Sequence, residues 1–307
     1  MRYYPILRGR MNELMAIREL AEDKRLHNVC PIIEPVKANP TLKKTLEELS
    51  KNEVMAYFVN NPQVGTYEAD VTGNRELREG IEALVAESSI GRCMILAGPG
   101  EDDWLSDPPD LVLFTNENAW ECERAAIGDR DVAFQIVSPL SISFLMASGN
   151  KIRLKDEFHR CSRNADYRKI QEEPFFTDYS DIRQFNFEGF SDYSIVGSEY
   201  AEGGFMPRAV AAHIVFPVEG EQKCAIRHFV SDERKDADRD TAGKYGEVVS
   251  QISAWLTCHN IEEMQTLGMQ HLLDTVERGA FPGLGMLKRF TIMHHLELMG
   301  KLLDKWQ

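Results

Sequence analysis

Charged and amide side chains follow several apolar runs of the chain, where predicted strands end. Arg8 and Arg10 follow the first run, Glu34 and Lys37 lie at the end of the second, and Asn60 follows the third. Carboxylate, guanidinium and ammonium groups gathered at one rim can bind an anion and move a proton. We therefore predict that Glu34 and Lys37 are catalytic and that Arg8, Arg10 and Asn60 bind an anionic substrate. The alternative is an internal ion pair that locks the rim.

A second group of residues has the chemistry of a magnesium site. Asp156 follows a predicted strand at 152–154, and Asp192 opens the next, at 193–196. Arg163 and Asp166 lie between these two strands. Acidic side chains on successive strands can hold Mg²⁺ for phosphodiester chemistry, so Asp192 is a candidate catalytic residue and Arg163 a candidate anion-binding residue. Salt-bridged loop anchors are the alternative, because Asp192 precedes the apolar part of its strand.

Three further patterns have a functional and a structural interpretation. Residues 151–170 hold seven Lys or Arg against three acidic residues, with Phe158 and Tyr167 between them, which suits either a nucleic-acid contact or a locally paired surface. Residues 236–240 with Glu247 match part of a calcium loop, but a helix starting after Asp240 explains them as well. His213 and His228 face each other across a predicted hairpin, and the histidines assemble into no metal site.

The elements that position these residues alternate between strand and helix. Predicted strands at 3–7, 29–36, 53–59 and 92–97 are separated by helices at 12–23, from 40, and at 75–88. The strands are continuous apolar runs, as expected when helices cover both faces of a parallel sheet. Further strands are expected at 111–115, 132–137, 152–154, 193–196, 209–216 and 224–230, and helices at 241–258 and 284–306. We predict one α/β domain spanning 1–307, a TIM-like (β/α) barrel with an irregular second half and C-terminal helices from about 241.

Composition narrows the classes of protein. The chain is 43% hydrophobic with a net charge of −14, from 35 Lys plus Arg against 49 Asp plus Glu. An acidic surface repels polyanions, so broad nonspecific binding to nucleic acid is not expected. Six cysteines are scattered without C-x-x-C pairs, which fits reduced thiols. No apolar run reaches the roughly 20 residues that cross a bilayer, and we expect a soluble cytoplasmic protein without a membrane partner.

Several segments carry a resemblance to a known family. They are YPILRGR at 4–10, PIIEPVK at 31–37, RNADY at 163–167, GFSDYS at 189–194, GGF at 203–205 and AAHIV at 211–215. Together they resemble the bacterial and phage "beta protein" family, whose members have no assigned reaction. The resemblance implies a TIM-barrel-like fold and a role in anti-phage defence or a mobile element beside a nuclease-like partner protein.

Three functions follow from these observations. The first is a component of such a defence system that acts with its nuclease-like partner. The second is a barrel hydrolase for phosphodiesters or nucleotides, with its site at Arg8, Glu34 and Lys37 and with Mg²⁺ as a possible cofactor. The third is a nucleic-acid binder that uses residues 151–170.

Overall fold

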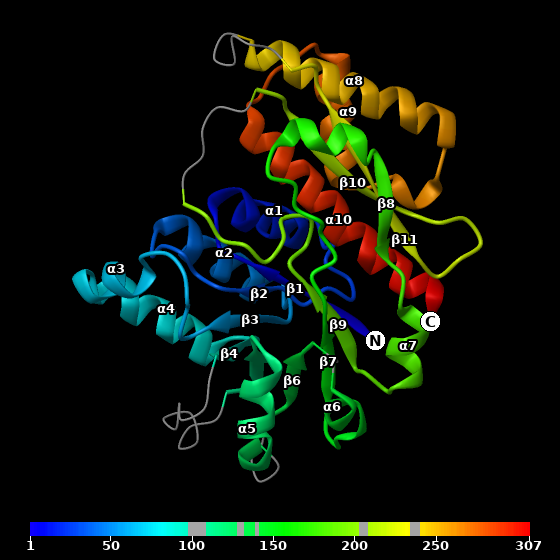
Figure 1. The fold of residues 1–307 in the computed structure, drawn as a ribbon. Coiled ribbons are helices and arrows are strands. Elements are labelled where there is room, and N and C mark those ends of the chain that lie inside the picture. The colour runs from blue at the N-terminus through cyan, green and yellow to red at the C-terminus, as the bar shows by residue number, and fades with distance from the viewer. Residues whose placement is uncertain (98–108, 128–131, 139–140, 203–207, 234–239) are drawn as a thin grey trace. The chain divides into compact units, whose positions relative to one another are not determined.

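The computed structural model describes residues 1–97, 109–127, 132–138, 141–202, 208–233 and 240–307 (Figure 1). The contacts between Cα atoms divide the chain into two compact units. The first consists of Met1–Asp156 and Ser180–Tyr193, and the second of Glu157–Tyr179 and Ser194–Gln307. The expectation of a single domain stays a prediction.

The first unit is a (β/α) barrel. Among the described residues, eight strands close it in the order β1-β2-β3-β4-β5-β6-β7-β9, and each neighbouring pair is parallel. The strands are β1 (Arg2–Leu7), β2 (Ile32–Ile33), β3 (Ala56–Val59), β4 (Ile90–Leu96), β5 (Leu111–Phe114), β6 (Phe134–Val137), β7 (Lys151–Leu154) and β9 (Gly189–Asp192). The predicted TIM-like α/β barrel is therefore confirmed.

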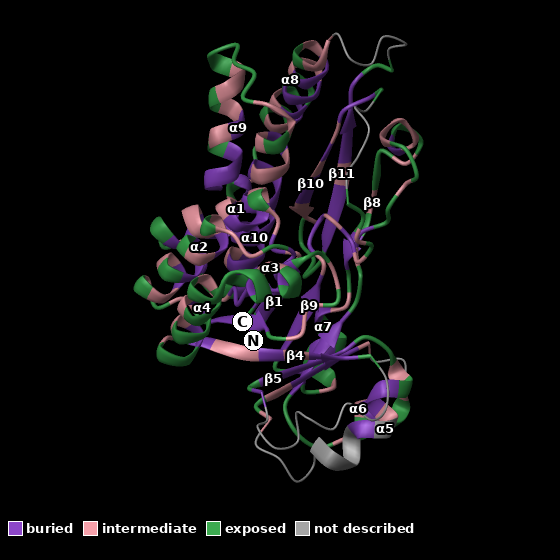
Figure 2. Ribbon diagram, turned by 90° about the vertical axis from the view of Figure 1, so that its left-hand side faces the viewer, coloured by how far each residue is buried: buried purple, intermediate pink, exposed green. Residues whose placement is uncertain are grey.

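Helices connect most of these strands. They are α1 (Met11–Glu22), α2 (Pro40–Lys51), α3 (Tyr67–Gly73), α4 (Arg75–Glu87), α5 (Glu117–Ile127) and α6 (Ile142–Met146). The start of α2 follows local chemistry, because Asn39 accepts a hydrogen bond from the backbone N–H of Leu42 at 3.0 Å. Pro40 occupies the first turn, where no backbone donor is needed. Figure 2 shows α4 with an exposed outer face, whereas β1 and β9 are buried.

The barrel interior is filled by alternate residues of the strands. Tyr4 and Ile6 of β1 point inward, as do Tyr57 of β3 and Leu154 of β7. The ring of Tyr4 lies 5.9 Å from that of Phe134, so aromatic side chains occupy the space. Because side chains alternate along a strand, the residue two positions beyond the last inward-facing one lies on the same side, at the carboxyl end of the strand. The interior is a packed core, and its carboxyl end is the place for polar chemistry.

The eighth barrel strand corrects one sequence prediction. A strand was predicted at 193–196, but the strand is β9, Gly189–Asp192, which pairs with β1 and β7. A side chain at Gly189 would meet the backbone oxygen of Arg2 at 2.2 Å. Ser191 donates its hydroxyl hydrogen to the carbonyl oxygen of Tyr4 at 2.7 Å. Small residues are needed where the barrel closes, so this strand lacks the apolar run that marks the others.

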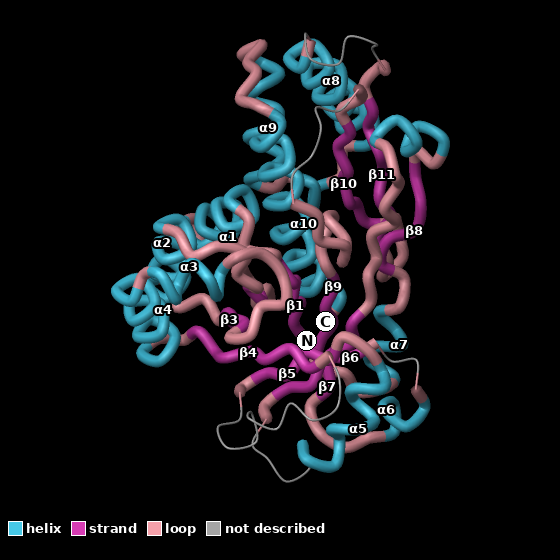
Figure 3. Tube along the Cα trace, turned by 60° about the vertical axis from the view of Figure 1, so that its left-hand side comes forward, coloured by secondary structure: helices cyan, strands magenta, loops and turns pink. Residues whose placement is uncertain are grey.

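The second unit contains a three-stranded antiparallel sheet in the order β10-β11-β8. Its elements are η2 (Asn164–Lys169), β8 (Glu172–Phe176), β10 (Ala211–Pro217), β11 (Cys224–Val230), α8 (Thr241–His259), η3 (Glu262–Met264), α9 (Leu267–Glu277) and α10 (Leu284–Trp306). The boundary between the units falls within α7 (Tyr179–Gln184), whose first residue belongs to the second unit and whose other residues belong to the first. The predicted hairpin of β10 and β11 is confirmed, with His213 opposite His228. Figure 3 shows α10 beside β10, with α8 and α9 as the other long helices of this unit.

Two details of the helices bear on earlier expectations. Asp240 accepts a hydrogen bond from the backbone N–H of Gly243 at 2.9 Å, which confirms it as the cap of α8. The other residues of the supposed calcium loop, 236–239, lie outside the described residues. None of the helices in the described ranges combines the length and the apolarity that crossing a membrane requires.

Candidate functional site

The barrel mouth is formed by residues that follow the strands at their carboxyl ends. Arg8 follows β1 and forms an ion pair with Glu34, which follows β2. The Glu34 side chain is 0% exposed and that of Arg8 is 15% exposed. The other carboxylate oxygen of Glu34 accepts the backbone N–H of Gln63 at 2.8 Å. Both oxygens of Glu34 are therefore engaged, while the guanidinium of Arg8 reaches the surface of the mouth.

Two glycines allow the loops to approach this ion pair. Gly9 has a φ of +58°, and a Cβ there would lie 3.0 Å from the carbonyl oxygen of Glu34. Gly65 has a φ of +83°, and a Cβ there would lie 2.2 Å from the carbonyl oxygen of Val36. Side chains are disfavoured at both positions by backbone conformation and by space. The chain following β1 and the loop that carries Gln63 can therefore both lie against the end of β2.

Three further residues complete the mouth. The guanidinium carbon of Arg8 lies 5.1 Å from the centre of the Tyr193 ring, a cation–π distance. Asp156, exposed just beyond β7, interacts electrostatically with both Arg8 and Tyr193. Burial lowers the pKa of Arg8 and raises that of Tyr193. The side-chain amide of Asn61 bonds both backbone groups of Ile95 at 2.8 Å and so continues the pairing with β4 beyond the end of β3.

The sequence identified part of this set. Arg8 and Glu34 come together as predicted, whereas Tyr193 was assigned to a strand of its own. For Asp156, the sequence suggested a magnesium ligand or a salt-bridged loop anchor. The available signal was position: Asp156 lies two residues beyond inward-facing Leu154, as Glu34 lies two beyond Ile32. The same alternation places Tyr193 at the mouth only when the bounds of the eighth strand are known. That strand was expected at 193–196, whereas β9 ends at Asp192.

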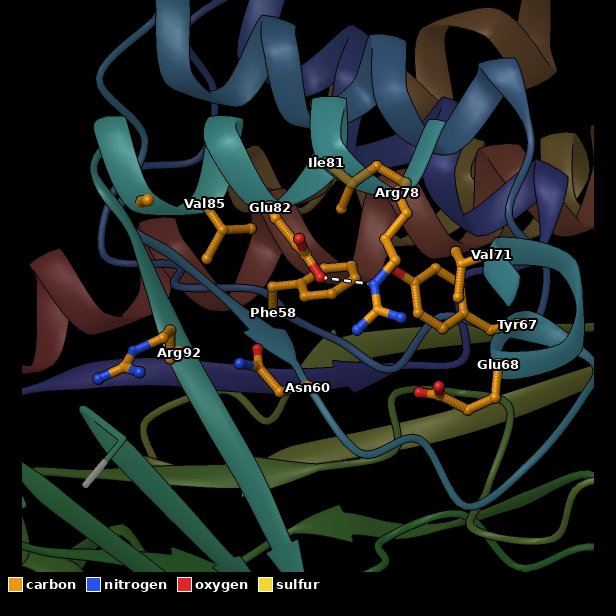
Figure 4. A pocket seen from close by; sticks show the side chains of 11 residues that line it. Phe58, Asn60, Tyr67, Glu68, Val71, Arg78, Ile81, Glu82, Val85 and Arg92 are labelled. Atoms are coloured by element: carbon orange, nitrogen blue, oxygen red, sulfur yellow. Dashed lines mark hydrogen bonds and ion pairs between the residues drawn. The ribbon is translucent and has the colours of Figure 1, made fainter. Parts of the chain in front are cut away.

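The other predicted site residues take no part in the contacts of Arg8 and Glu34. Lys37 is exposed, and among the described residues it makes no hydrogen bond or ion pair. Arg10 is the cap residue of α1, and its backbone N–H donates to Glu13 at 3.5 Å. Asn60 lines a pocket outside the barrel wall (Figure 4). Arg163 belongs to the second unit, where its guanidinium bonds both oxygens of Asp166 at 3.1 Å.

Asp192 is placed differently from the prediction. It is the last residue of β9 rather than the residue before a strand, so it lies at the carboxyl end of the barrel. Its neighbour Tyr193 packs against the interior, and alternation turns Asp192 to the outer side of the wall. There it is 1% exposed and accepts the hydroxyl of Tyr3 at 2.6 Å. Within the described residues, no group of three His, Cys, Asp or Glu is arranged to hold a metal ion.

The basic segment 151–170 is divided between the units. Lys151 and Arg153 belong to β7 and are buried in the first unit. Four cations of the second unit form ion pairs there: Arg160 with Glu199, Arg163 and Lys169 with Asp166, and Arg168 with Asp232. At least six of the seven positive charges are thus buried or paired. This arrangement favours a locally compensated surface over a strip that tracks phosphates.

A chain of hydrogen bonds joins the histidines of the second unit. The Nδ1 atoms of His213 and His228 are 2.8 Å apart, and Nε2 of His228 lies 3.1 Å from Oε1 of Glu173. The other oxygen of Glu173 lies 3.3 Å from Nδ1 of exposed His159. The ring of Tyr167 packs 4.5 Å from that of His213 and 4.7 Å from that of His228. The predicted facing of His213 and His228 is confirmed.

The direction of this chain follows from the carboxylate. An ionised Glu173 only accepts, so Nε2 of His228 donates to it and Nδ1 of His228 accepts from Nδ1–H of His213. Both imidazoles are then neutral. Burial lowers the pKa of His213 to about 3, and burial also lowers that of His228 against the opposing effect of Glu173. A neutral pair with this low proton affinity is suited to holding the sheet rather than to accepting protons at neutral pH.

Comparison with known proteins adds no relative. No family model, no curated protein and no solved structure matches the chain.

Proposed function

We propose that the first unit is a hydrolase that acts on a small phosphate-bearing substrate at the barrel mouth. The observation that carries this proposal is Arg8: a guanidinium at the carboxyl end of β1, 15% exposed, held by Glu34 on one side and by the Tyr193 ring on another. In barrels of this architecture, substrates bind at the carboxyl ends of the strands. A pre-oriented guanidinium is the group best matched to phosphate oxygens.

Each residue of the mouth has its own role in this proposal. Arg8 binds the phosphate, and Glu34 positions Arg8 because its own oxygens are fully engaged. Asp156 is exposed beside them and accepts the proton of the attacking water as the water oxygen bonds to phosphorus and the leaving oxygen departs. Lys37, exposed beyond the end of β2, attracts the anionic substrate. Glu34 is thereby a positioning residue rather than the general base expected from the sequence.

Binding and turnover of defined phosphates test the proposal. The purified chain is titrated with inorganic phosphate and assayed with phosphomonoesters, phosphodiesters and nucleotides, with and without Mg²⁺. Arg8→Gln is expected to weaken phosphate binding about tenfold or more, because a charge-assisted pair is lost. Asp156→Asn is expected to abolish turnover while phosphate still binds.

Arg2→Gln is the matched control, because Arg2 is exposed at the opposite end of the same strand β1. It is expected to bind phosphate as the wild-type chain does. Equal phosphate affinity for Arg8→Gln and the wild-type chain contradicts the assignment of Arg8. Absence of turnover across the whole panel contradicts the hydrolase.

The defence role is a separate proposal that depends on the sequence resemblance alone. We propose that the chain acts with a nuclease-like partner protein encoded beside it in anti-phage defence. Co-expression and pull-down of the two products test this association. Failure of the pair to co-purify ends this proposal and leaves that for the barrel mouth unaffected.

A further inference from the structure

A hollow of about 340 Å³ lies on the outer side of the barrel wall, between β3 and α4 (Figure 4). The barrel interior takes Tyr57, so β3 turns its neighbours Phe58 and Asn60 toward the helices. Helix α4 supplies Ile81 and Val85 from the other side. Apolar helix residues normally fill this layer completely. Here the cover leaves a space of the size that small molecules occupy.

The floor of this pocket is aromatic and apolar. The rings of Phe58 and Tyr67 meet edge to face, with centres 5.8 Å apart and planes at 66°. Both side chains are buried, as are Ile81 and Val85. Burial raises the pKa of Tyr67 to about 12, so its hydroxyl keeps its proton at neutral pH. In the part of the chain that the structure describes, this hydroxyl makes no hydrogen bond, and it is not among the polar atoms that are fully buried without a partner.

The edge of the pocket is polar and partly unengaged. Arg78 and Glu82 satisfy each other, with Nε 2.8 Å from Oε1. The side chains of Asn60 and Glu68, by contrast, make no hydrogen bond or ion pair with any described residue. Figure 4 shows the heads of Asn60 and Glu68 directed toward the space below α4. The pocket therefore offers an aromatic wall, together with an amide and a carboxylate that form no hydrogen bond within the described part of the chain; the carboxylate interacts electrostatically with Arg78.

We propose that this pocket binds a planar nitrogen heterocycle with an exocyclic amino group, such as an aminopurine. The ring packs on Phe58, Tyr67 and Val85, since aromatic side chains are the usual partners of flat heterocycles. The amide of Asn60 pairs with an adjacent donor and acceptor on the ring edge, as asparagine does with adenine. The Glu68 carboxylate accepts from the amino group. This site is independent of the chemistry at the barrel mouth.

Titration of the full chain with adenine, followed by ligand-observed NMR, tests the proposal. Adenine is expected to bind saturably, and purine, which lacks the amino group, to bind about tenfold more weakly. Asn60→Ala and Glu68→Gln are each expected to weaken adenine binding about tenfold. Glu76→Gln is the matched control, because Glu76 is an exposed carboxylate on α4, the helix that covers the pocket, and does not itself line the pocket.

A second variant fills the space itself. Val85→Phe places a ring where the ligand would lie and is expected to abolish adenine binding, with circular dichroism to verify that the variant is folded. If it does not fold, the exposed Asn60 and Glu68 variants still decide the question. The proposal is overturned if adenine fails to saturate the wild-type chain, or if Asn60→Ala and Glu68→Gln bind adenine as tightly as the wild type.

Discussion

The two units differ in the titratable side chains that they bury. In the barrel, Arg8 and Glu34 form a charged pair at the mouth. The second unit also buries the carboxylate of Glu297, which pairs with Lys301, but its buried histidines are held neutral. His294, for example, donates from Nε2 to the carbonyl oxygen of Val215 at 2.8 Å, and burial lowers its pKa to about 4. The difference is between a site that depends on its counter-ion and one that depends on the absence of a proton.

The two units should therefore be sensitive to different changes, the barrel to substitution and the second unit to acid. Removing one partner of a buried ion pair leaves the other charge without compensation, which costs more than the intact pair contributes. Removing one hydrogen bond from a neutral network costs less. Protonation at low pH, however, places a poorly solvated charge on each buried histidine. Substitution should therefore damage the barrel most, and acid the second unit.

The largest effect is expected at the barrel mouth. Glu34→Leu leaves the guanidinium of Arg8 without its carboxylate and should lower the free energy of unfolding by about 3–5 kcal/mol. Urea unfolding followed by fluorescence measures this loss. The double variant Arg8→Met, Glu34→Leu should recover most of it, because no charge is then left alone. A loss below about 1 kcal/mol in the single variant would show that the pair is not needed.

The next largest effect is expected from acid, which should destabilise the second unit more than the barrel. Burial lowers the pKa of His213 to about 3, of His294 to about 4 and of His295 to about 3. Because these folded values lie below the unfolded value near 6.5, the stabilisation is complete above about pH 6.5 and is lost as the pH falls toward 4. Each histidine contributes at most about 1.4 kcal/mol per pH unit in that window.

The measurement is the free energy of unfolding at pH 7, 6 and 5. His213→Gln removes one titrating group and should flatten the pH dependence relative to the wild-type chain, whatever its effect at pH 7. An unchanged slope would mean that His213 is not protonated on unfolding in this range.

A smaller effect is expected from the hydrogen bond between Tyr3 and Asp192. Tyr3→Phe removes a buried donor at 2.6 Å and should lower the free energy of unfolding by about 1–2 kcal/mol. Because the hydroxyl is neutral, the loss should be well below that of Glu34→Leu. The reverse order would contradict the idea that charge sets the sensitivity of the barrel.

The smallest effect is expected at the open end of the histidine chain. The side chain of His159 is 61% exposed and contacts Glu173 from solvent. His159→Ala should change the free energy of unfolding by no more than about 0.5 kcal/mol, as exposed pairs contribute little. A larger change would place His159 inside the network rather than at its edge.

The first half of the barrel was predictable because its local signals agree. The apolar run at 53–59, the cap Asn39 and the helix at 75–88 all appear in the structure close to their predicted bounds. The same is true of the hairpin that brings His213 opposite His228, since its two strands are close in sequence. Local pattern is enough where each element satisfies its own requirements.

The site was harder to predict because it depends on how β9 closes the barrel between β1 and β7. Glu34 and Arg8 follow neighbouring strands, so their meeting could be inferred from order alone. Tyr193 reaches the mouth only because β9 ends at Asp192, and β9 carries Gly189 and Ser191 instead of an apolar run. Strand β8 was missed for a related reason, since Pro174 interrupts its pattern. Tertiary packing, not local preference, selects these segments.

The late arrival of β9 has a consequence for how the chain is made. During synthesis, β7 emerges by Leu154, but its barrel neighbour β9 follows only after β8 and α7. Until residue 192 has left the ribosome, β1 and β7 keep unpaired edges that can recruit strands from another nascent chain. A truncated product ending near Asp156 is thus expected to aggregate, and chaperones that mask strand edges should be most needed in that interval.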